Sequence, residues 1–505
     1  MDVQTVLAVN LMAISALMIA LWLAQRRRDL MSFTLVNALV LAVGAIALWR
    51  MPQEAGGLVA FVFVPLVATP LALGAFQTRF TRAGRMEAAA RCADLVALFH
   101  PTPAMRLSAA CARAAAIPDP REKARVLAAL AADAPSGQAA GIEARLLADR
   151  GEWDKVLVLS QDPENARQLC GYRFRALGEA GRVEELMRDY ARSSDVIPLE
   201  QTPFAWLFVL AFGGRPRDVS ALAARLLRVD ADTAAYWIGV ARLQAGDEKA
   251  ARSEFQMLAA SVKESPAATA ARRQLAKEWG PPLPLSPRAR EIVDGVAARA
   301  AIEISRQERG WRPPPVTLAL GLANAAMFAA EIALGGSQNA DTLIALGALW
   351  PPLALDGEGW RILTATFLHY GFLHFALNML MLGLIGREVE YEVGSLRTLG
   401  AYVGGALFSS VFVLVLMERG VVGYGLYVGA SGAIFALFGV IGALRTKDWL
   451  RHRASLDSFR VTVVGFAMLV QIAADFLLPL SSLTAHLSGF GFGLVLGMFV
   501  GPKRR

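Results

Sequence analysis

The sequence contains few cysteines and few charged residues. Only three cysteines occur among 505 residues, Cys92, Cys111 and Cys170, and their spacing does not match a metal-binding motif. All three fall in one segment that is expected to face the cytosol, so free thiols are predicted rather than disulfides. Charged residues make up 19% of the chain and hydrophobic residues 55%, with a mean hydropathy of +0.42. A composition this apolar excludes a single soluble domain and indicates membrane spans.

The chain also lacks the patterns of a nucleic-acid-binding protein and of a signal peptide. The net charge is +8, but the basic residues cluster beside apolar runs, and no basic stripe interleaved with aromatic residues occurs. We therefore expect no nucleic-acid partner. No lysine or arginine precedes the first apolar run, whereas three arginines follow it at 26–28. Because a signal peptide carries its positive charge in front, this run is a predicted membrane span with its N-terminus outside.

Nine apolar runs predict an all-α, polytopic membrane protein embedded in a lipid bilayer. Three runs lie within residues 1–84, at about 6–24, 31–49 and 57–76, and six lie within residues 313–505, at about 316–334, 363–385, 398–416, 428–444, 459–478 and 483–500. Basic residues gather in the connections that this order places inside, and at 503–505. The charge bias predicts a cytoplasmic C-terminus. The alanine- and arginine-rich composition favours a bacterial cytoplasmic membrane.

Residues 85–312 form the predicted cytosolic domain. No apolar run here is long enough to span a bilayer, and the segment is rich in alanine, leucine, glutamate and arginine with helical periodicity. Gly151, Gly181, Gly214 and Gly246 each lie between two helical stretches, about 30 to 33 residues apart. This period resembles that of tetratricopeptide repeats. A generic helical bundle is the alternative, and either reading favours a surface that binds protein partners over a catalytic domain.

Four polar residues are predicted on the same side of the membrane in the C-terminal spans. Ser431 lies about 13 residues before the inner end of its helix, or roughly 20 Å, within a bilayer core about 30 Å thick. His486 lies at about the same depth on another helix that runs from outside to inside. His374 and Asn378 are four residues apart near the outer end of a third such helix, so they share one face. Polar groups that converge inside a membrane indicate a functional site.

These residue types fit nucleophilic catalysis. A serine hydroxyl becomes nucleophilic when a base such as the imidazole of His486 takes its proton. The Asn378 amide, the His374 ring and the backbone N–H of Ser431 are candidate donors to an oxyanion. Small residues at Gly432 and Gly489 would allow the two helices to approach closely.

The motifs resemble those of the rhomboid intramembrane serine proteases over about residues 315–505. The motifs are His374-x-x-x-Asn378, Gly429-x-Ser431-Gly432 and Ala485-His486-x-x-Gly489, with Trp360-Arg361, Glu390 and Gly394 as further similarities. The resemblance implies that Ser431 is the nucleophile and His486 the general base of a dyad, with His374 and Asn378 stabilising the oxyanion. It also implies a six-helix domain that cleaves transmembrane protein substrates without a metal or cofactor. One departure is Phe435, where bacterial members often carry a tyrosine stacked on the catalytic histidine.

Two alternatives to a rhomboid-type protease match parts of the sequence. A soluble Gly-x-Ser-x-Gly hydrolase elbow does not fit, because Ala433 follows Gly432 and the serine lies in a predicted span. A non-catalytic rhomboid-like protein that binds membrane proteins and recruits partners through the repeats remains open. The presence of Ser431, His486 and Gly429 argues against it. Among the other polar residues of the spans, His369 is interpreted as structural, and no role is evident for Glu331.

Overall fold

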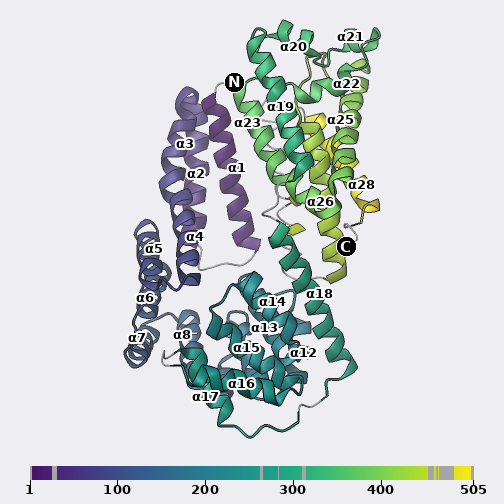
Figure 1. Ribbon diagram of the computed structural model, residues 1–505. Coiled ribbons are helices and arrows are strands. Elements are labelled where there is room, and N and C mark those ends of the chain that lie inside the picture. Colours follow the sequence, from purple (N-terminus) through teal and green to yellow (C-terminus); the bar gives the residue numbers. More distant parts are fainter. Residues whose placement is uncertain are drawn as a thin grey trace.

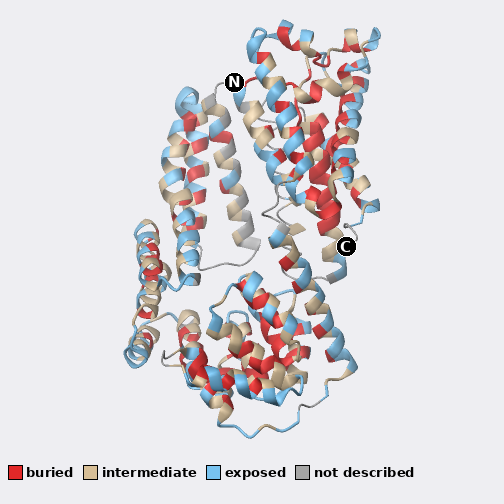
Figure 2. Cartoon of the chain, viewed as in Figure 1, coloured by how far each residue is buried: buried red, intermediate tan, exposed pale blue. Residues whose placement is uncertain are grey.

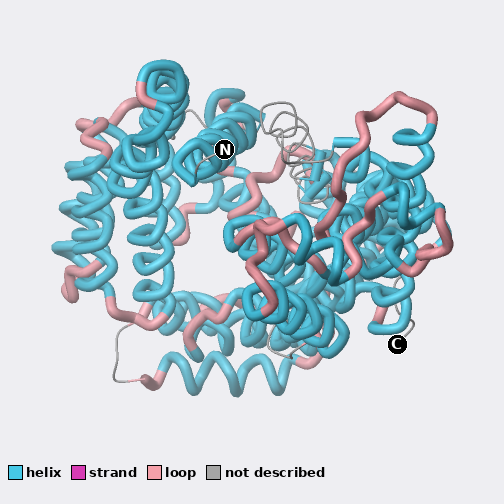
Figure 3. The backbone as a smooth tube through the Cα atoms, turned by 90° about the horizontal axis from the view of Figure 1, so that it is seen from above, coloured by secondary structure: helices cyan, strands magenta, loops and turns pink. Residues whose placement is uncertain are grey.

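The computed structural model describes residues 3–24, 31–261, 265–281, 284–309, 314–452, 460–461, 464–465 and 483–501. The described residues contain helices and no β-strand, with one isolated antiparallel bridge between Leu349 and Tyr427. Figure 1 shows an N-terminal helical bundle beside a C-terminal bundle, and a third helical body below both. Viewed from above in Figure 3, the described chain is again helix and loop. The protein is thus an all-α polytopic membrane protein, as predicted from its sequence.

The N-terminal bundle consists of helices joined by short connections. Its elements are α1 (Val3–Ala24), α2 (Met31–Arg50), α3 (Ala55–Phe63), a π-helical turn (Val64–Ala68) and α4 (Thr69–Arg82). The third predicted span contains Pro65, which has no N–H to donate. The helix does not end there, because the widened π-turn accommodates the proline and the Thr69 hydroxyl donates to the Val64 carbonyl at 3.0 Å.

Within the described part of the chain, length and composition alone identify four helices that could cross a membrane, at Met31–Arg50, Pro52–Thr81, Pro315–Ala333 and Ser395–Glu418. Shorter apolar helices occur at Leu7–Ala16, Thr202–Phe212 and Leu483–Phe499. The segment Thr202–Phe212 is apolar for another reason. Nine of its eleven residues are buried at the centre of the helical body, where a helix surrounded by other helices has no polar face. The predicted span at 459–478 lies outside the described residues except for 460–461 and 464–465.

The helical body consists largely of paired helices. Its elements are α5 (Met86–Phe99), α6 (Pro103–Ala115), α7 (Pro120–Ala132), α8 (Ser136–Arg150), α9 (Trp153–Leu159), α10 (Pro163–Ala166), α11 (Cys170–Glu179), α12 (Val183–Ser193), α13 (Thr202–Phe212), α14 (Pro216–Ala221), η4 (Leu222–Leu227), α15 (Ala231–Gln244), α16 (Glu248–Ala259), α17 (Pro266–Leu275) and α18 (Pro287–Arg309). Several helix starts are capped by short polar side chains; for example, Asp230 accepts the N–H of Thr233 at 2.9 Å.

The four glycines that mark the predicted repeat all lie at turns between helices. Gly151, Gly181, Gly214 and Gly246 have φ angles of 76°, 76°, 69° and 85°. A side chain is disfavoured in this left-handed region, so glycine suits the turn that reverses the chain. The helix pairs α8/α9, α11/α12, α13/α14 and α15/α16 flank these turns. Their assignment to the tetratricopeptide family remains a prediction.

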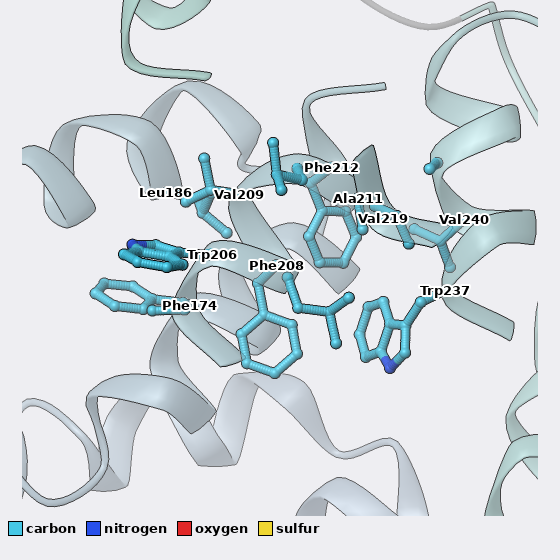
Figure 4. Close-up of a cluster of buried hydrophobic side chains, with 14 of the residues drawn as sticks. Phe174, Leu186, Trp206, Phe208, Val209, Ala211, Phe212, Val219, Trp237 and Val240 are labelled. Atoms are coloured by element: carbon cyan, nitrogen blue, oxygen red, sulfur yellow. The ribbon is translucent and has the colours of Figure 1, made fainter. Parts of the chain in front are cut away.

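Aromatic and aliphatic side chains fill the centre of this body, as Figure 4 shows around α13. Phe208 packs against Trp237 with ring centroids 5.1 Å apart, and Phe212 meets the same indole at 6.0 Å. Successive helix pairs therefore share one continuous core, and each pair depends on its neighbours for burial.

The C-terminal bundle contains the predicted site residues. Its elements are α19 (Pro315–Ala333), α20 (Ala340–Leu346), α21 (Pro351–Leu355), α22 (Arg361–Thr364), η5 (Ala365–Phe367), α23 (Phe372–Met381), a π-helical segment (Leu382–Gly386), α24 (Arg387–Val393), α25 (Ser395–Glu418), α26 (Ser431–His452) and α28 (Leu483–Phe499). The run at 363–385 is not one helix as expected. The long helix begins at Phe372, directly after Gly371, whose φ of 87° breaks the preceding helical path.

Helix α26 lies at the centre of this bundle, as the buried residues in Figure 2 show. It packs against α28 with almost no space between the backbones. A Cβ atom on Gly489 would lie 2.2 Å from the Gly432 carbonyl oxygen, and one on Gly493 would lie 1.8 Å from that of Ala436. On its other side, a Cβ on Gly405 of α25 would meet the Ala436 Cβ at 2.2 Å. These glycines set the distance between the helices.

Charged residues connect α18 to the end of the bundle that the sequence predicts to face the cytoplasm, called the inner end below. This set, called the inner ionic cluster below, comprises Glu303 and Arg306 of α18, Glu388 and Glu392 of α24, Arg445 and Asp448 of α26, and Arg460. Arg306 donates to Glu392 at 2.7 Å and to Asp448 at 3.2 Å. Arg460 binds Glu303 at 2.7 and 2.8 Å. The helical body is therefore linked to the helix that carries Ser431.

Candidate active site

Ser431 is the first residue of α26. The preceding turn is held by Gly429, whose N–H donates to the Ala365 carbonyl at 2.9 Å, and the N–H of Ile434 bonds back to Ala430 at 3.0 Å. The first N–H groups of a helix have no acceptor within the helix, and the helix dipole makes this end partially positive. The N–H of Ser431 therefore belongs to a backbone region that suits a negatively charged oxygen.

The His374 ring and the Ser431 hydroxyl lie beside the same glycine. A Cβ atom built on Gly429 would be 2.8 Å from Cε1 and 3.0 Å from Nε2 of His374, and 3.8 Å from Oγ of Ser431. Both polar groups are thus within 4 Å of one point. Gly429 also has a φ of 130°, which L-amino acids rarely adopt. Glycine is favoured at this position both by its backbone conformation and by the His374 ring, which a Cβ atom would crowd.

His486 lies on α28 against the first turns of α26. Its side chain is buried, and its ring stacks on Phe435 with centroids 4.4 Å apart and an interplanar angle of 20°. Phe435 is four residues after Ser431, so it stands on the same face of α26. The close contact between Gly432 and Gly489, described above, brings the two helices together at this level. The phenyl ring at 435 supports the imidazole without a hydroxyl group.

Asn378 follows His374 by one turn of α23 and is buried. Its Nδ2 donates to the His374 carbonyl at 2.9 Å. A side-chain amide carries two N–H donors, and this bond uses one of them. The structure therefore brings together the regions of all four predicted polar residues, which come from α23, α26 and α28.

Glu331 is a buried acid beside this group of residues. It is inaccessible to solvent, and its Oε1 accepts the backbone N–H of His369 at 2.8 Å. The His369 ring in turn meets the His374 ring edge-on at 5.4 Å. The sequence alone indicates no role for Glu331. Its position as an ionisable residue within a predicted span was the available signal.

Two further residues of the family-like pattern organise the ends of the bundle. Arg361 is buried and donates to the carbonyls of Ile344 and Ala348 at 2.6 and 3.2 Å, which holds the outer loop. At the inner end, Glu390 accepts the N–H groups of Val316 and Thr317 at 3.0 and 2.8 Å.

The Glu390 carboxylate is stabilised in its charged form. Burial alone would raise the pKa of Glu390. The two backbone N–H groups, together with the hydroxyls of Ser395 and Thr317, outweigh burial and hold the pKa below its ordinary value. A charged Glu390 therefore fixes the starts of α19 and α25 next to each other.

No metal-binding group is found among the residues that the structure describes, since no three His, Cys, Asp or Glu side chains are placed to hold an ion. The arrangement offers a hydroxyl, an imidazole and several N–H donors, and these groups are those of acyl transfer by a serine nucleophile.

Comparison with known proteins identifies the C-terminal region. Residues 356–503 match the family model described as Rhomboid domain. RHOMBOID-like protein 5 of Arabidopsis thaliana is 34% identical over 156 residues, which is 31% of this chain and 48% of that protein. Rhomboid protease GluP of Bacillus subtilis (strain 168) is 38% identical over 170 residues, 34% of this chain and 32% of GluP. Rhomboid-like protease 1 of Toxoplasma gondii is 31% identical over 163 residues, 32% of this chain and 53% of that protein. The chain spans about half, or less, of the length of these relatives.

Proposed function

The chain belongs to the rhomboid family through its domain at 356–503, and from this premise we propose that it is an intramembrane serine endopeptidase with Ser431 and His486 as a catalytic dyad. The observation that carries the proposal is the convergence of three helices. Ser431 and His374 face one point beside Gly429, and His486 stacks on the ring one turn after Ser431. Two of the relatives named above, GluP and Rhomboid-like protease 1, are named as proteases.

The proposed reaction is acyl transfer in two steps. The imidazole of His486 takes the proton of the Ser431 hydroxyl as Oγ attacks the carbonyl carbon of the scissile peptide bond. The oxyanion accepts hydrogen bonds from the N–H of Ser431, the Asn378 amide and the His374 ring. The intermediate collapses, the C–N bond breaks, and His486 gives its proton to the leaving amine. Water then attacks the acyl-enzyme, with His486 again acting as base, and a carboxylic acid is released.

The proposed substrates are membrane proteins cleaved within or next to a transmembrane segment. The support is the depth of the site, since Ser431 begins a helix whose inner end is marked by the ionic cluster. The proposed orientation has the N-terminus outside and the C-terminus in the cytoplasm, which places the helical body in the cytosol to bind protein partners. The composition favours a bacterial cytoplasmic membrane, but the relatives named above come from a plant and Toxoplasma gondii as well as a bacterium and do not support it.

The test is cleavage of a generic transmembrane reporter by the purified protein in detergent, beside the Ser431→Ala variant. We expect cleavage by the wild type and at least a thousand-fold loss in the variant, because the proposed acyl-enzyme forms on the Ser431 hydroxyl, which alanine lacks. Labelling of the wild type by a fluorophosphonate probe, lost in Ser431→Ala and His486→Ala, is the second readout. Equal cleavage by wild type and Ser431→Ala would contradict the assignment. Absence of both cleavage and labelling would favour the non-catalytic membrane-protein binder.

A further inference from the structure

Glu331 occupies a position where a charged residue is costly. It is on α19, inside a predicted membrane span, and it is fully buried. Among the described residues its Oε2 has no hydrogen-bond partner, while Oε1 has one, the backbone N–H of His369. A buried polar atom without a partner destabilises a fold. General stability therefore does not account for the Glu331 carboxyl, and its hydrogen bond to the His369 N–H is the better explanation of its presence.

The bond of Glu331 fixes the segment that precedes His374. His369 and Gly371 form the bend before α23, where Gly371 has a φ of 87°. The His369 side chain is fully buried, and its ring stands edge-on to that of His374 at 5.4 Å with an interplanar angle of 65°. A shift of the His369 backbone would therefore move the ring against which the His374 imidazole rests.

Helix α19 also packs against the residue that follows His374. Phe328, three residues before Glu331, stacks on Phe375 with centroids 4.4 Å apart and an interplanar angle of 7°. Residues three apart lie on one face of a helix. One face of α19 thus contacts both His369 and Phe375, which lie five residues before and one residue after His374. The packing fixes Phe375, and the hydrogen bond from Glu331 fixes the bend.

We propose that Glu331 is a positioning residue, whose hydrogen bond to the His369 backbone N–H holds the His374 imidazole at the oxyanion site. The inference rests on the proposed protease function and goes beyond it, because Glu331 itself does not touch the substrate. What matters is an acceptor atom at the reach of a glutamate side chain. Glutamine keeps an acceptor oxygen at the same distance, and leucine has none. Aspartate keeps the acceptor but is shorter by one methylene group, so its oxygen cannot reach the same N–H.

The experiment measures kcat and KM of the purified full-length protein on a transmembrane reporter. We expect Glu331→Gln to stay within about threefold of the wild-type kcat. Glu331→Leu and Glu331→Asp should lose about 10- to 100-fold in kcat with little change in KM, since misplacing one oxyanion donor costs up to that order. Where Glu331→Leu does not fold, Glu331→Asp decides. Equal loss in Glu331→Gln and Glu331→Leu would overturn the proposal.

A double-mutant cycle separates positioning from a structural role. If Glu331 acts through His374, Glu331→Leu should reduce kcat by less than about twofold in a His374→Ala background. Losses that multiply in the double variant would overturn the inference. The matched control is Asn324→Ala, two turns earlier on α19, where a buried amide donates to the Leu320 carbonyl at 2.7 Å. It should lower the melting temperature without a comparable loss of kcat. A comparable loss of kcat there would contradict a specific role for Glu331.

Failure of this inference and failure of the proposed function give different results. Cleavage that depends on Ser431 but not on Glu331 overturns the inference alone. Cleavage that does not depend on Ser431 overturns the proposed function, and the inference with it.

Discussion

The side chain of Asn378 is held by a hydrogen bond on its own helix. Its amide donates one hydrogen to the His374 carbonyl at 2.9 Å, so the side chain is held in one orientation on α23. The bond uses one of the two hydrogens of the amide, so the second hydrogen can still be donated to the proposed oxyanion. The same bond also ties the amide to the backbone of His374.

We predict that Asn378→Ala lowers kcat by about 10²-fold, the lower end of the effect of removing one oxyanion donor. KM should change little, because the donor acts on the transition state rather than on the bound substrate. Steady-state cleavage of a transmembrane reporter measures this. Asn378→Asp replaces the donor by an acceptor and should be at least as slow. An unchanged rate in Asn378→Ala would show that this residue is not an oxyanion donor.

The candidate site residues could be predicted individually, whereas their supports could not. A fixed helical rise sets the depth of Ser431 and His486, and spacing by four puts His374 and Asn378 on one face. Glu331 binds an N–H that lies 38 residues away in an irregular bend, and no local pattern predicts that contact. His100 is similar. Without a visible partner in the sequence, its ring bonds to the Leu66 carbonyl at 2.9 Å and stacks on Phe33 at 3.8 Å.

Two glycines of α28, Gly491 and Gly493, differ sharply in their surroundings. On α28, a Cβ atom at Gly493 would lie 1.8 Å from the Ala436 carbonyl oxygen, whereas one at Gly491 would meet nothing within 4 Å. The clash at Gly493 is with backbone, which cannot turn aside as a flexible side chain could. The two positions provide a matched pair on one helix.

We predict that Gly493→Ala reduces the free energy of unfolding by about 2 kcal/mol, within the range for overpacking a tight interface. It should also slow cleavage, because the helices that carry Ser431 and His486 must separate. Gly491→Ala should have neither effect, since alanine is a better helix former than glycine. Thermal unfolding in detergent, measured beside fluorophosphonate labelling, tests both variants. Equal stability of the two would mean that this contact is looser than the structure indicates.

At the level of elements, helix existence was predictable and helix starts were less so. The apolar runs at 316–334 and 398–416 correspond closely to α19 (Pro315–Ala333) and α25 (Ser395–Glu418). The run at 363–385 contains short helices and a bend before α23, because residues such as Thr366 and Leu368 are buried in the fold rather than in one straight helix. Hydrophobicity reports burial, and it does not tell a helix from a packed loop.

The whole molecule is connected at the inner ionic cluster, where α18 of the helical body meets α24 and α26. Glu392 is central to this cluster, since it accepts from Arg306 at 2.7 Å and from Arg445 at 3.1 Å. Burial alone would raise the pKa of Glu392. The positive charges of Arg445 and Arg306 outweigh burial, and the pKa lies below its ordinary value of 4.5.

The lowered pKa of Glu392 predicts a dependence of stability on acid. A carboxyl whose pKa is lower in the folded than in the unfolded state stabilises the fold above its unfolded pKa, and the contribution is lost as pH falls through the folded pKa. We expect the melting temperature of the wild type to fall below about pH 4.5. Glu392→Gln should be less stable near pH 7 and should show a shallower decline in acid. Parallel pH profiles of the two proteins would contradict this role.

Arg306 links the helical body to the C-terminal bundle, whereas Arg445 pairs with acids of that bundle itself. Without Arg306, α18 loses its contacts with Glu392 and Asp448. The charge of Glu392 is still balanced, because Arg445 remains paired with it. We therefore predict that Arg306→Met increases hydrogen exchange at the C-terminal end of α18 by about tenfold or more, corresponding to the loss of about 1.4 kcal/mol of local stability. Labelling of Ser431 by a fluorophosphonate should stay within about twofold.

The matched control for this last prediction is Arg225→Met. Arg225 pairs with Glu308 of α18 at 3.1 Å, but both side chains are more than half exposed and the pair lies within the helical body. Exposed ion pairs contribute little, so exchange in α18 should hardly change. A large increase of hydrogen exchange in both variants would mean that any ion pair of α18 stabilises this helix, and that the pairs of Arg306 are not special. A loss of Ser431 labelling in Arg306→Met alone would instead mean that the inner ionic cluster transmits the state of the helical body to the nucleophile, since α26 is the one helix that carries both Ser431 and Arg445.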